Sequence, residues 1–207
     1  TDGGEGALVA TATYSNRIGN ASDKAAFTNV YESSMDYGAG GAGGINVTKQ
    51  LNGRPMTADE FTFNVTGQGD AADMTTDLDR EFKNTGAAEG ETITMEKLQS
   101  LTFDQDDVGK TFSFIVDEVE GDQSTTKIDY DQSQYRVDIA VYDDGLGNMH
   151  AVTNVTRIMD TDGNTVSEPV VTDANSSADG YEVPTFGFVN TYRPDPVGVG
   201  EDTQNAI

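Results

Sequence analysis

The stretch Ile45-Asn46-Val47-Thr48-Lys49-Gln50-Leu51 guides the interpretation of the whole chain. Side chains alternate across a β-strand, so Ile45, Val47, Lys49 and Leu51 share one face, which is apolar except for the lysine. We therefore predict a strand that carries its lysine into a hydrophobic core. A lysine stem can also lie along an apolar surface with its amine in water, so this stretch alone leaves that alternative open.

Two more stretches repeat the pattern with a different polar residue. In Thr111-Phe112-Ser113-Phe114-Ile115-Val116-Asp117-Glu118 the apolar face ends at Glu118, and in Phe186-Gly187-Phe188-Val189-Asn190-Thr191-Tyr192 it includes Asn190. A lysine, a glutamate and an asparagine buried among aromatic residues would be costly to keep apart. Together they are the three groups required for a spontaneous lysine–asparagine amide bond. Taken singly, Glu118 could be a surface charge and Asn190 could cap a turn.

The chemistry of such a site follows from burial. A low-polarity environment lowers the pKa of Lys49 and raises that of Glu118, which favours a neutral pair. We expect Glu118 to take a proton from Lys49 and to donate a hydrogen bond to the carboxamide oxygen of Asn190, while Lys49 attacks and ammonia leaves. Each molecule reacts once, so the chain is predicted not to be an enzyme. Two nearby carboxylates, Asp117 and Glu120, compete with Glu118 for this role. Asp117 should face outward, and Glu120 lies nearer the end of the strand.

The composition restricts the possible functions. The chain has 207 residues, with 12 Lys and Arg against 36 Asp and Glu, for a net charge of −24. Such a surface repels phosphate backbones and anionic lipid, so we expect no nucleic-acid or membrane partner. There is no cysteine and only one histidine, His150, which excludes thiolate and multi-histidine metal sites. No cofactor or metal is expected, and the chain resembles a fragment of a longer secreted protein.

Strand signals dominate the sequence. Runs rich in Val, Ile, Thr, Tyr and Phe are separated by the turn-forming stretches Asp143–Asn148 and Asp160–Asn164. We predict an all-β sandwich with strands over Thr111–Val116, Gln134–Tyr142, His150–Met159 and Phe186–Tyr192. Short helical decorations are expected at Met56–Phe61, Met74–Phe82 and Met95–Ser100. The second turn also resembles the start of a calcium loop, but a hairpin turn explains it better.

A repeated pattern divides the chain. Phe-x-Asn-x-Tyr occurs at 27–31 and again at 188–192. We interpret residues 1–36 as the last two strands of a preceding copy of the same repeat, which points to an array of like modules. Residues 37–44 then form a Gly-rich linker, residues 45–192 the main domain and residues 193–207 a linker or tail. Asn29 is the matching asparagine of the preceding repeat. Its lysine partner should lie upstream, outside this fragment, so we expect that Asn29 is not cross-linked.

Taken in order, these stretches resemble a known family. The lysine strand followed by Asn52-Gly53-Arg54-Pro55 and Glu60-Phe61-Thr62-Phe63, the glutamate strand, the hairpin at Asp143–Asn148 and the closing Phe188–Tyr192 are similar to the streptococcal pilin isopeptide-linkage domain, the FctA-like module of Gram-positive pilins and surface adhesins. The resemblance implies an immunoglobulin-like β-sandwich, related to collagen-binding adhesin B-type (CnaB) modules. It implies that Lys49 and Asn190 are cross-linked and that Glu118 is the catalytic acid.

The resemblance also implies a mechanical function. The domain would be one unit of a stalk or fibre on the bacterial cell surface or cell wall, with neighbouring repeats of the same protein as partners. The alternative is an adhesin domain that binds a host glycan or matrix protein through its loops, and the polar, irregular region Gly67–Asp107 is the place to expect such a surface.

Overall fold

The computed structural model describes two short strands, β1 (Tyr14–Ser15) and β2 (Ala21–Ser22), and then residues 29–38, 44–74, 81–87, 90–95, 98, 100–167, 171–175 and 182–196. The chain divides into two compact units, Thr1–Glu32 and Ser33–Ile207. In the first unit β1 and β2 pair antiparallel. The second unit holds the other described strands and the site.

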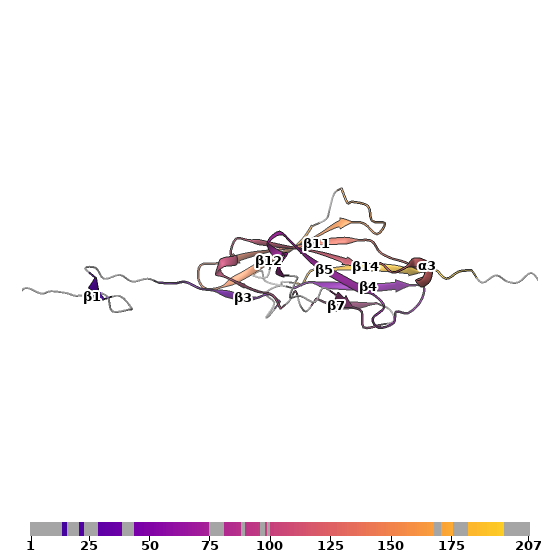
Figure 1. Ribbon diagram of the computed structural model, residues 1–207, viewed down its shortest axis with the longest axis horizontal. Helices are drawn as coiled ribbons and strands as arrows, with labels where there is room; N and C mark the ends of the chain where they lie inside the picture. The colour runs from indigo at the N-terminus through magenta and orange to yellow at the C-terminus, as the bar shows by residue number, and fades with distance from the viewer. Residues whose placement is uncertain are drawn as a thin grey trace, which may run out of the picture. The chain divides into compact units, whose positions relative to one another are not determined.

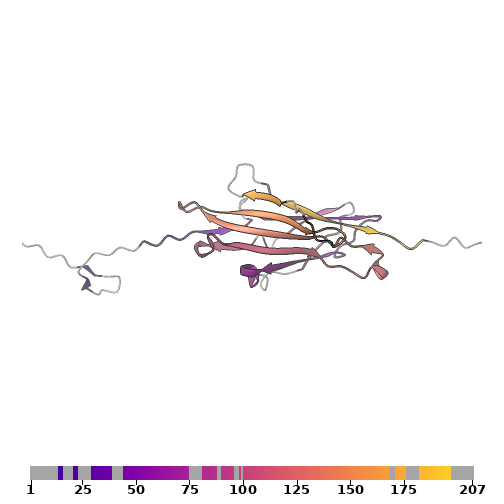
Figure 2. The same cartoon turned by 90° about the horizontal axis from the view of Figure 1, so that it is seen from above.

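Two sheets face each other in the second unit (Figure 1). The smaller sheet has the order β10-β14-β4-β7, built from Ile128–Asp129, Thr185–Tyr192, Asn46–Asn52 and Glu91–Thr94. The larger has the order β13-β12-β11-β9-β5-β6, built from Val171–Asn175, Met149–Met159, Gln134–Asp143, Thr111–Glu118, Thr62–Gln68 and Glu81–Lys83. The two views show the long strands running in nearly one direction (Figure 2). The predicted all-β sandwich is confirmed.

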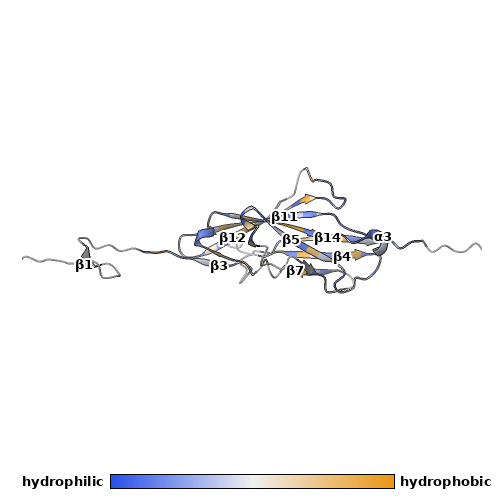
Figure 3. Ribbon diagram, viewed as in Figure 1, coloured by the Kyte–Doolittle hydropathy of each residue, from blue (hydrophilic) through white to orange (hydrophobic). Residues whose placement is uncertain are grey.

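Alternating burial explains why the two sheets pack together. Every second residue of β4 is buried, and the same is true of β9, so each strand presents one apolar face to the other sheet. Colouring by hydropathy shows the resulting mixture of polar and apolar residues along the strands (Figure 3). Phe63 and Phe188, from opposite sheets, meet in the core with ring centroids 5.4 Å apart. The site lies in this core.

The four predicted long strands are present, with ends shifted by no more than two residues. The stretches Asp143–Asn148 and Asp160–Asn164 are turns, each closed by a backbone hydrogen bond across it. The helical predictions were less accurate. Met56–Phe61 has no helix, and Glu81 and Phe82 belong to β6. Met74 and Leu98, one in each of the other two segments, are helical, and parts of both segments lie outside the described residues. The four-residue helix α3 (Gln123–Thr126) was not predicted.

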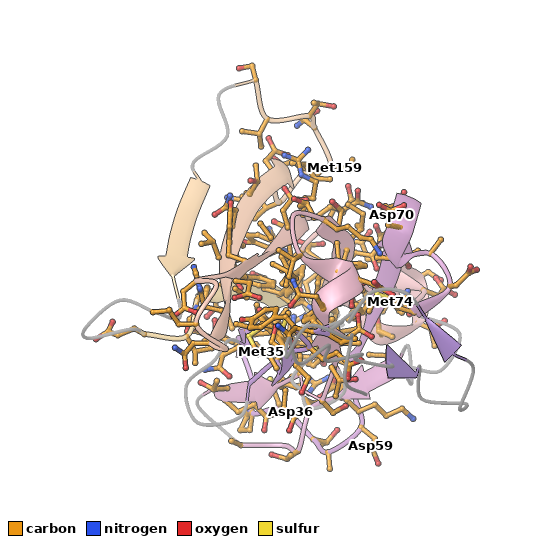
Figure 4. All side chains as sticks on the ribbon, turned by 90° about the vertical axis from the view of Figure 1, so that its left-hand side faces the viewer. Met35, Asp36, Asp59, Asp70, Met74 and Met159 are labelled. Carbon is orange, nitrogen blue, oxygen red and sulfur yellow. The ribbon has the colours of Figure 1, made fainter. Side chains whose placement is uncertain are left out.

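Two parts of the predicted layout differ from the structure. The region Gly67–Asp107 is less irregular than expected, because its described residues include β6, β7 and β8 (Thr102–Asp104) with two 3-10 turns, Gly69–Ala71 and Gln105–Asp107. The domain also begins earlier in the chain than the predicted residue 45. Strand β3 (Ser34–Asp36) pairs with β8, and Met35 packs toward the core while Asp36 stays at the rim (Figure 4).

Tyr37 is part of the core of the second unit and does not belong to a linker. Its side chain is fully buried, its ring meets Phe103 edge-on, and its hydroxyl hydrogen-bonds Thr153 Oγ1 at 2.6 Å. The sequence pattern predicts a preceding repeat over residues 1–36 and a linker over residues 37–44. The compact unit instead begins at Ser33, since Met35 and Tyr37 bury apolar area in its core. The origin of the earlier residues in another repeat stays a prediction.

Strands β4 and β14 lie side by side and run parallel, and every other pair among the described strands is antiparallel. Their register places Phe188 opposite Lys49 and Asn190 opposite Leu51. Gly187 permits this approach, because a Cβ atom there would lie 1.9 Å from Thr48 Oγ1 and 3.0 Å from its carbonyl oxygen. The lysine and the asparagine are therefore held on adjacent strands, facing β9.

Candidate functional site

Lys49, Glu118 and Asn190 meet between the two sheets. Lys49 Nζ donates to Glu118 Oε2 at 2.8 Å, and Asn190 Nδ2 donates to Glu118 Oε1 at 2.8 Å. One carboxyl group therefore contacts both the amine and the carboxamide nitrogen. The glutamate comes from β9 of one sheet, and its two partners come from the parallel strands β4 and β14 of the other.

The site is closed to solvent. The side chains of Lys49 and Glu118 are 0% exposed, and Asn190 is fully buried. The Lys49 amine also lies 4.3 Å from the centre of the buried Phe61 ring, whose face favours a cation. A buried ion pair without full hydrogen bonding costs free energy, so these groups are held by the fold and do not stabilise it by charge alone.

Burial shifts both titrating groups toward their neutral forms. Loss of hydration lowers the pKa of Lys49, although the charge of Glu118 opposes this shift. Loss of hydration also raises the pKa of Glu118 to about 7, against the opposing effects of Lys49 and the Asn190 hydrogen bond. The two pKa values therefore move toward each other, which makes the neutral amine and the neutral acid more accessible.

The carboxamide of Asn190 is oriented differently from our prediction. We expected Glu118 to donate to the carboxamide oxygen. Instead, Glu118 contacts the carboxamide nitrogen, and the oxygen Oδ1 accepts a hydrogen bond of 2.8 Å from the backbone N–H of Asp131. A backbone N–H can only donate, so it selects the oxygen end of the amide. Glu118 thus lies on the side of the leaving nitrogen.

Sequence reasoning missed two neighbours of the site. Asp131 is 4% exposed and lies in the loop between β10 and β11. No local pattern distinguishes it from the many other acidic residues of this chain. Phe61 belongs to a motif that we noted, but the strand periodicity gave no indication that its ring would cover the lysine amine.

The competing carboxylates lie elsewhere. Asp117 is on the opposite face of β9 from Glu118, as expected from the alternation, but it is half-buried and not open to solvent. Glu120 is exposed and follows the end of the strand. Glu118 is therefore the carboxyl group among these three that reaches both Lys49 and Asn190.

The remaining candidates do not form a second site. The His150 ring stacks on Tyr142 with centroids 5.4 Å apart. Within the described ranges, no group of three His, Cys, Asp or Glu residues is suited to hold a metal ion. None of the helices described in the structure is long and apolar enough to cross a membrane. Asn29 has no regular secondary structure, and Phe27 of the same motif lies outside the described residues.

Comparison with known proteins agrees with the family resemblance. A family profile described as "Spy0128-like isopeptide containing domain" (FctA) matches residues 45–193. A search of curated proteins found no match. Two similar solved structures are a major pilin protein from Streptococcus pyogenes (14% identity, TM-score 0.39, covering 77% of this chain and 54% of that one) and a mutant of the major pilin from Streptococcus pyogenes (16%, 0.34, covering 72% and 51%).

The chain thus spans about half the length of these pilins. The family match covers most of the chain and coincides with the sandwich that holds the lysine, glutamate and asparagine. This chain belongs to the family of Spy0128-like isopeptide-containing domains.

Proposed function

We propose that this domain forms an amide bond between Lys49 and Asn190, promoted by Glu118, and serves as a structural module of a pilin or adhesin stalk on a bacterial cell surface. The observation that carries the proposal is the contact of one buried carboxyl group with both reacting side chains, at 2.8 Å each. The family description supports the same chemistry.

The reaction balances without a cofactor. A proton passes from the Lys49 ammonium to the Glu118 carboxylate, which leaves a neutral amine and a neutral acid. Nζ then attacks Cγ of Asn190 and forms the new C–N bond. As the Cγ–Nδ2 bond breaks, Glu118 gives its proton to Nδ2 and ammonia leaves, and the carboxylate so formed accepts the proton that Nζ loses. The fold supplies the high effective concentration of the two groups.

Intact mass tests the chemistry. The wild-type protein should be one ammonia lighter than its sequence requires, and a cross-linked peptide should contain both Lys49 and Asn190. Glu118→Gln should retain the full mass, because an amide cannot carry the proton between the two nitrogens. Asp117→Asn makes the same chemical change one residue away on the opposite face, and it should lose ammonia normally. A wild-type protein of full mass would disprove the proposal.

The strand arrangement supports the mechanical role. Strands β4 and β14 are adjacent and parallel (Figure 1). A covalent bond between them would therefore transmit a pulling force on the chain directly from Lys49 to Asn190. About 140 residues would then be excluded from extension, which corresponds to a contour length of about 500 Å at about 3.6 Å per residue. In single-molecule pulling, Glu118→Gln should gain this length on unfolding. Equal extension of wild type and variant would rule out the load-bearing role.

A further inference from the structure

Asp131 occupies an unusual position in the site, because two parts of the residue have separate tasks. Its backbone N–H donates to Asn190 Oδ1 at 2.8 Å. Its carboxylate accepts two other backbone hydrogen bonds, from Ser133 N at 2.9 Å and from Val189 N at 2.9 Å. The residue is almost completely buried.

The oxygen that Asp131 contacts is the one that becomes negatively charged. When the lysine amine attacks Cγ of Asn190, the carbonyl electrons move to Oδ1. A hydrogen-bond donor already aimed at that oxygen stabilises the charge without rearrangement, and its effect is large where water is excluded. The Glu118 carboxyl contacts the nitrogen end of the same amide. The developing oxyanion therefore needs another donor, and the Asp131 N–H already contacts Oδ1, the oxygen on which the charge forms.

The carboxylate of Asp131 fixes the position of this N–H. Through Val189 it ties the loop before β11 to β14 at the residue next to Asn190. Through Ser133 it closes the loop on itself, and the Ser133 hydroxyl accepts from Arg157 Nη2 on β12 at 2.8 Å. The donor and the asparagine are thus held by one set of hydrogen bonds that spans both sheets.

The negative charge of Asp131 has a second effect. It raises the pKa of Glu118 and so favours the protonated acid, while it also raises the pKa of Lys49 and opposes formation of the neutral amine. Because these two effects act in opposite directions on the proton exchange, electrostatics alone does not explain a buried aspartate here. Its hydrogen bonds to backbone groups do.

We propose that the Asp131 backbone N–H is the oxyanion donor of the cross-linking reaction and that the Asp131 carboxylate is the positioning group that holds this donor against Asn190. The proposal rests on the proposed function. In the reaction, Nζ of Lys49 bonds to Cγ, Oδ1 carries the charge against the Asp131 N–H, and the charge returns to the carbonyl as the Cγ–Nδ2 bond breaks. Nδ2 leaves as ammonia with the proton supplied by Glu118.

A kinetic experiment separates the donor from the carboxylate. The full chain is made by cell-free translation, which sets a starting time, and samples are acid-quenched and weighed to follow the loss of ammonia. In one protein the amide that precedes Asp131 is replaced by an ester, through incorporation of the α-hydroxy acid, so that the N–H is removed while the Asp131 side chain is kept. Loss of one oxyanion donor should slow the reaction about 100-fold or more. Asp131→Ala should slow it as well, and Asp131→Asn, which keeps one acceptor, should restore part of the rate.

A matched control uses another aspartate with the same kind of hydrogen bonds. Asp160 Oδ1 accepts from the N–H groups of Asp162 and Asn164 in a turn outside the site. Asp160→Ala should react at the wild-type rate. The rate of refolding from urea and the stability are measured for each change in an Asn190→Ala background, where no bond can form, so that slow folding is distinguished from slow chemistry.

The pH profile provides the decisive readout. Removal of an oxyanion donor should lower the rate by the same factor at every pH, because Lys49 and Glu118 still set the midpoints. An ester protein that reacts at the wild-type rate, or one whose profile shifts in pH while its maximum rate is unchanged, would overturn the proposal. If the wild-type chain never loses ammonia, the proposed function itself fails, and that result is distinct from either of these.

Discussion

Substitution of Asn190 by alanine tests how much a covalent link between β4 and β14 would stabilise the domain. The bond would close a loop of about 140 residues, and the chain-entropy relation for a cross-link of this length gives about 5 kcal/mol of stabilisation. The variant also leaves the Asp131 N–H without its partner, which costs about 1–3 kcal/mol. For a domain of this size, 5 kcal/mol corresponds to a decrease in Tm of about 10–20 °C.

Asn84→Ala is the matched control for this experiment. Asn84 is also buried, its Oδ1 accepts from Phe61 N at 2.8 Å, and its Nδ2 donates to the Thr57 carbonyl at 2.8 Å. The control loses a buried asparagine side chain and its two hydrogen bonds to backbone groups, but it keeps the three reacting groups. Its free energy of unfolding should therefore fall only by the contribution of these hydrogen bonds. Its mass should still be lower than the sequence mass by one ammonia.

The assay combines calorimetry, chemical denaturation and intact mass on the same three proteins. Asn190→Ala should be less stable than Asn84→Ala by about 5 kcal/mol, the entropic term alone. Equal losses of stability in the two variants would refute the reasoning, even if a cross-link were found by mass, because the bond would then contribute nothing to stability.

Three further predictions concern other parts of the chain. In Lys49→Met, Glu118 loses the cation that lowers its pKa, so its folded pKa stays at about 7 or above, while its unfolded pKa is about 4.5. Above about pH 4.5 the folded state then holds a proton that the unfolded state has lost. Stability should therefore fall by about 3 kcal/mol as the pH rises from about 4.5 through 7. Urea unfolding across this pH range measures the decrease, and a Glu118→Gln change in the same background should make stability independent of pH there. Deletion of residues 1–32 should leave Tm unchanged, whereas deletion through Tyr37 should lower it because the buried ring and β3 are lost; an equal Tm for both truncations would place the boundary elsewhere. Asn29 should stay uncross-linked, so a loss of two ammonia molecules in the intact mass would contradict this prediction.

The composition of the site could be predicted from the sequence because a strand alternates with a period of two. That local rule placed Lys49, Glu118 and Asn190 each on an otherwise apolar face, and the structure brings the three side chains into contact. It also placed Asp117 on the other face of β9. The same rule, with turn residues at Asp143–Asn148 and Asp160–Asn164, was sufficient for the all-β class and the positions of the long strands.

Other features required the tertiary structure, because they depend on residues far apart in sequence. Asp131 and Asn190 are 59 positions apart, and nothing in the local pattern indicates that a loop N–H will meet a carboxamide oxygen. The same holds for the orientation of the Asn190 amide, for Tyr37, which bonds a hydroxyl 116 positions away, and for the parallel pairing of β4 with β14. Sequence periodicity assigns a side chain to a face of its strand, but the packing of the two sheets determines which groups on those faces touch.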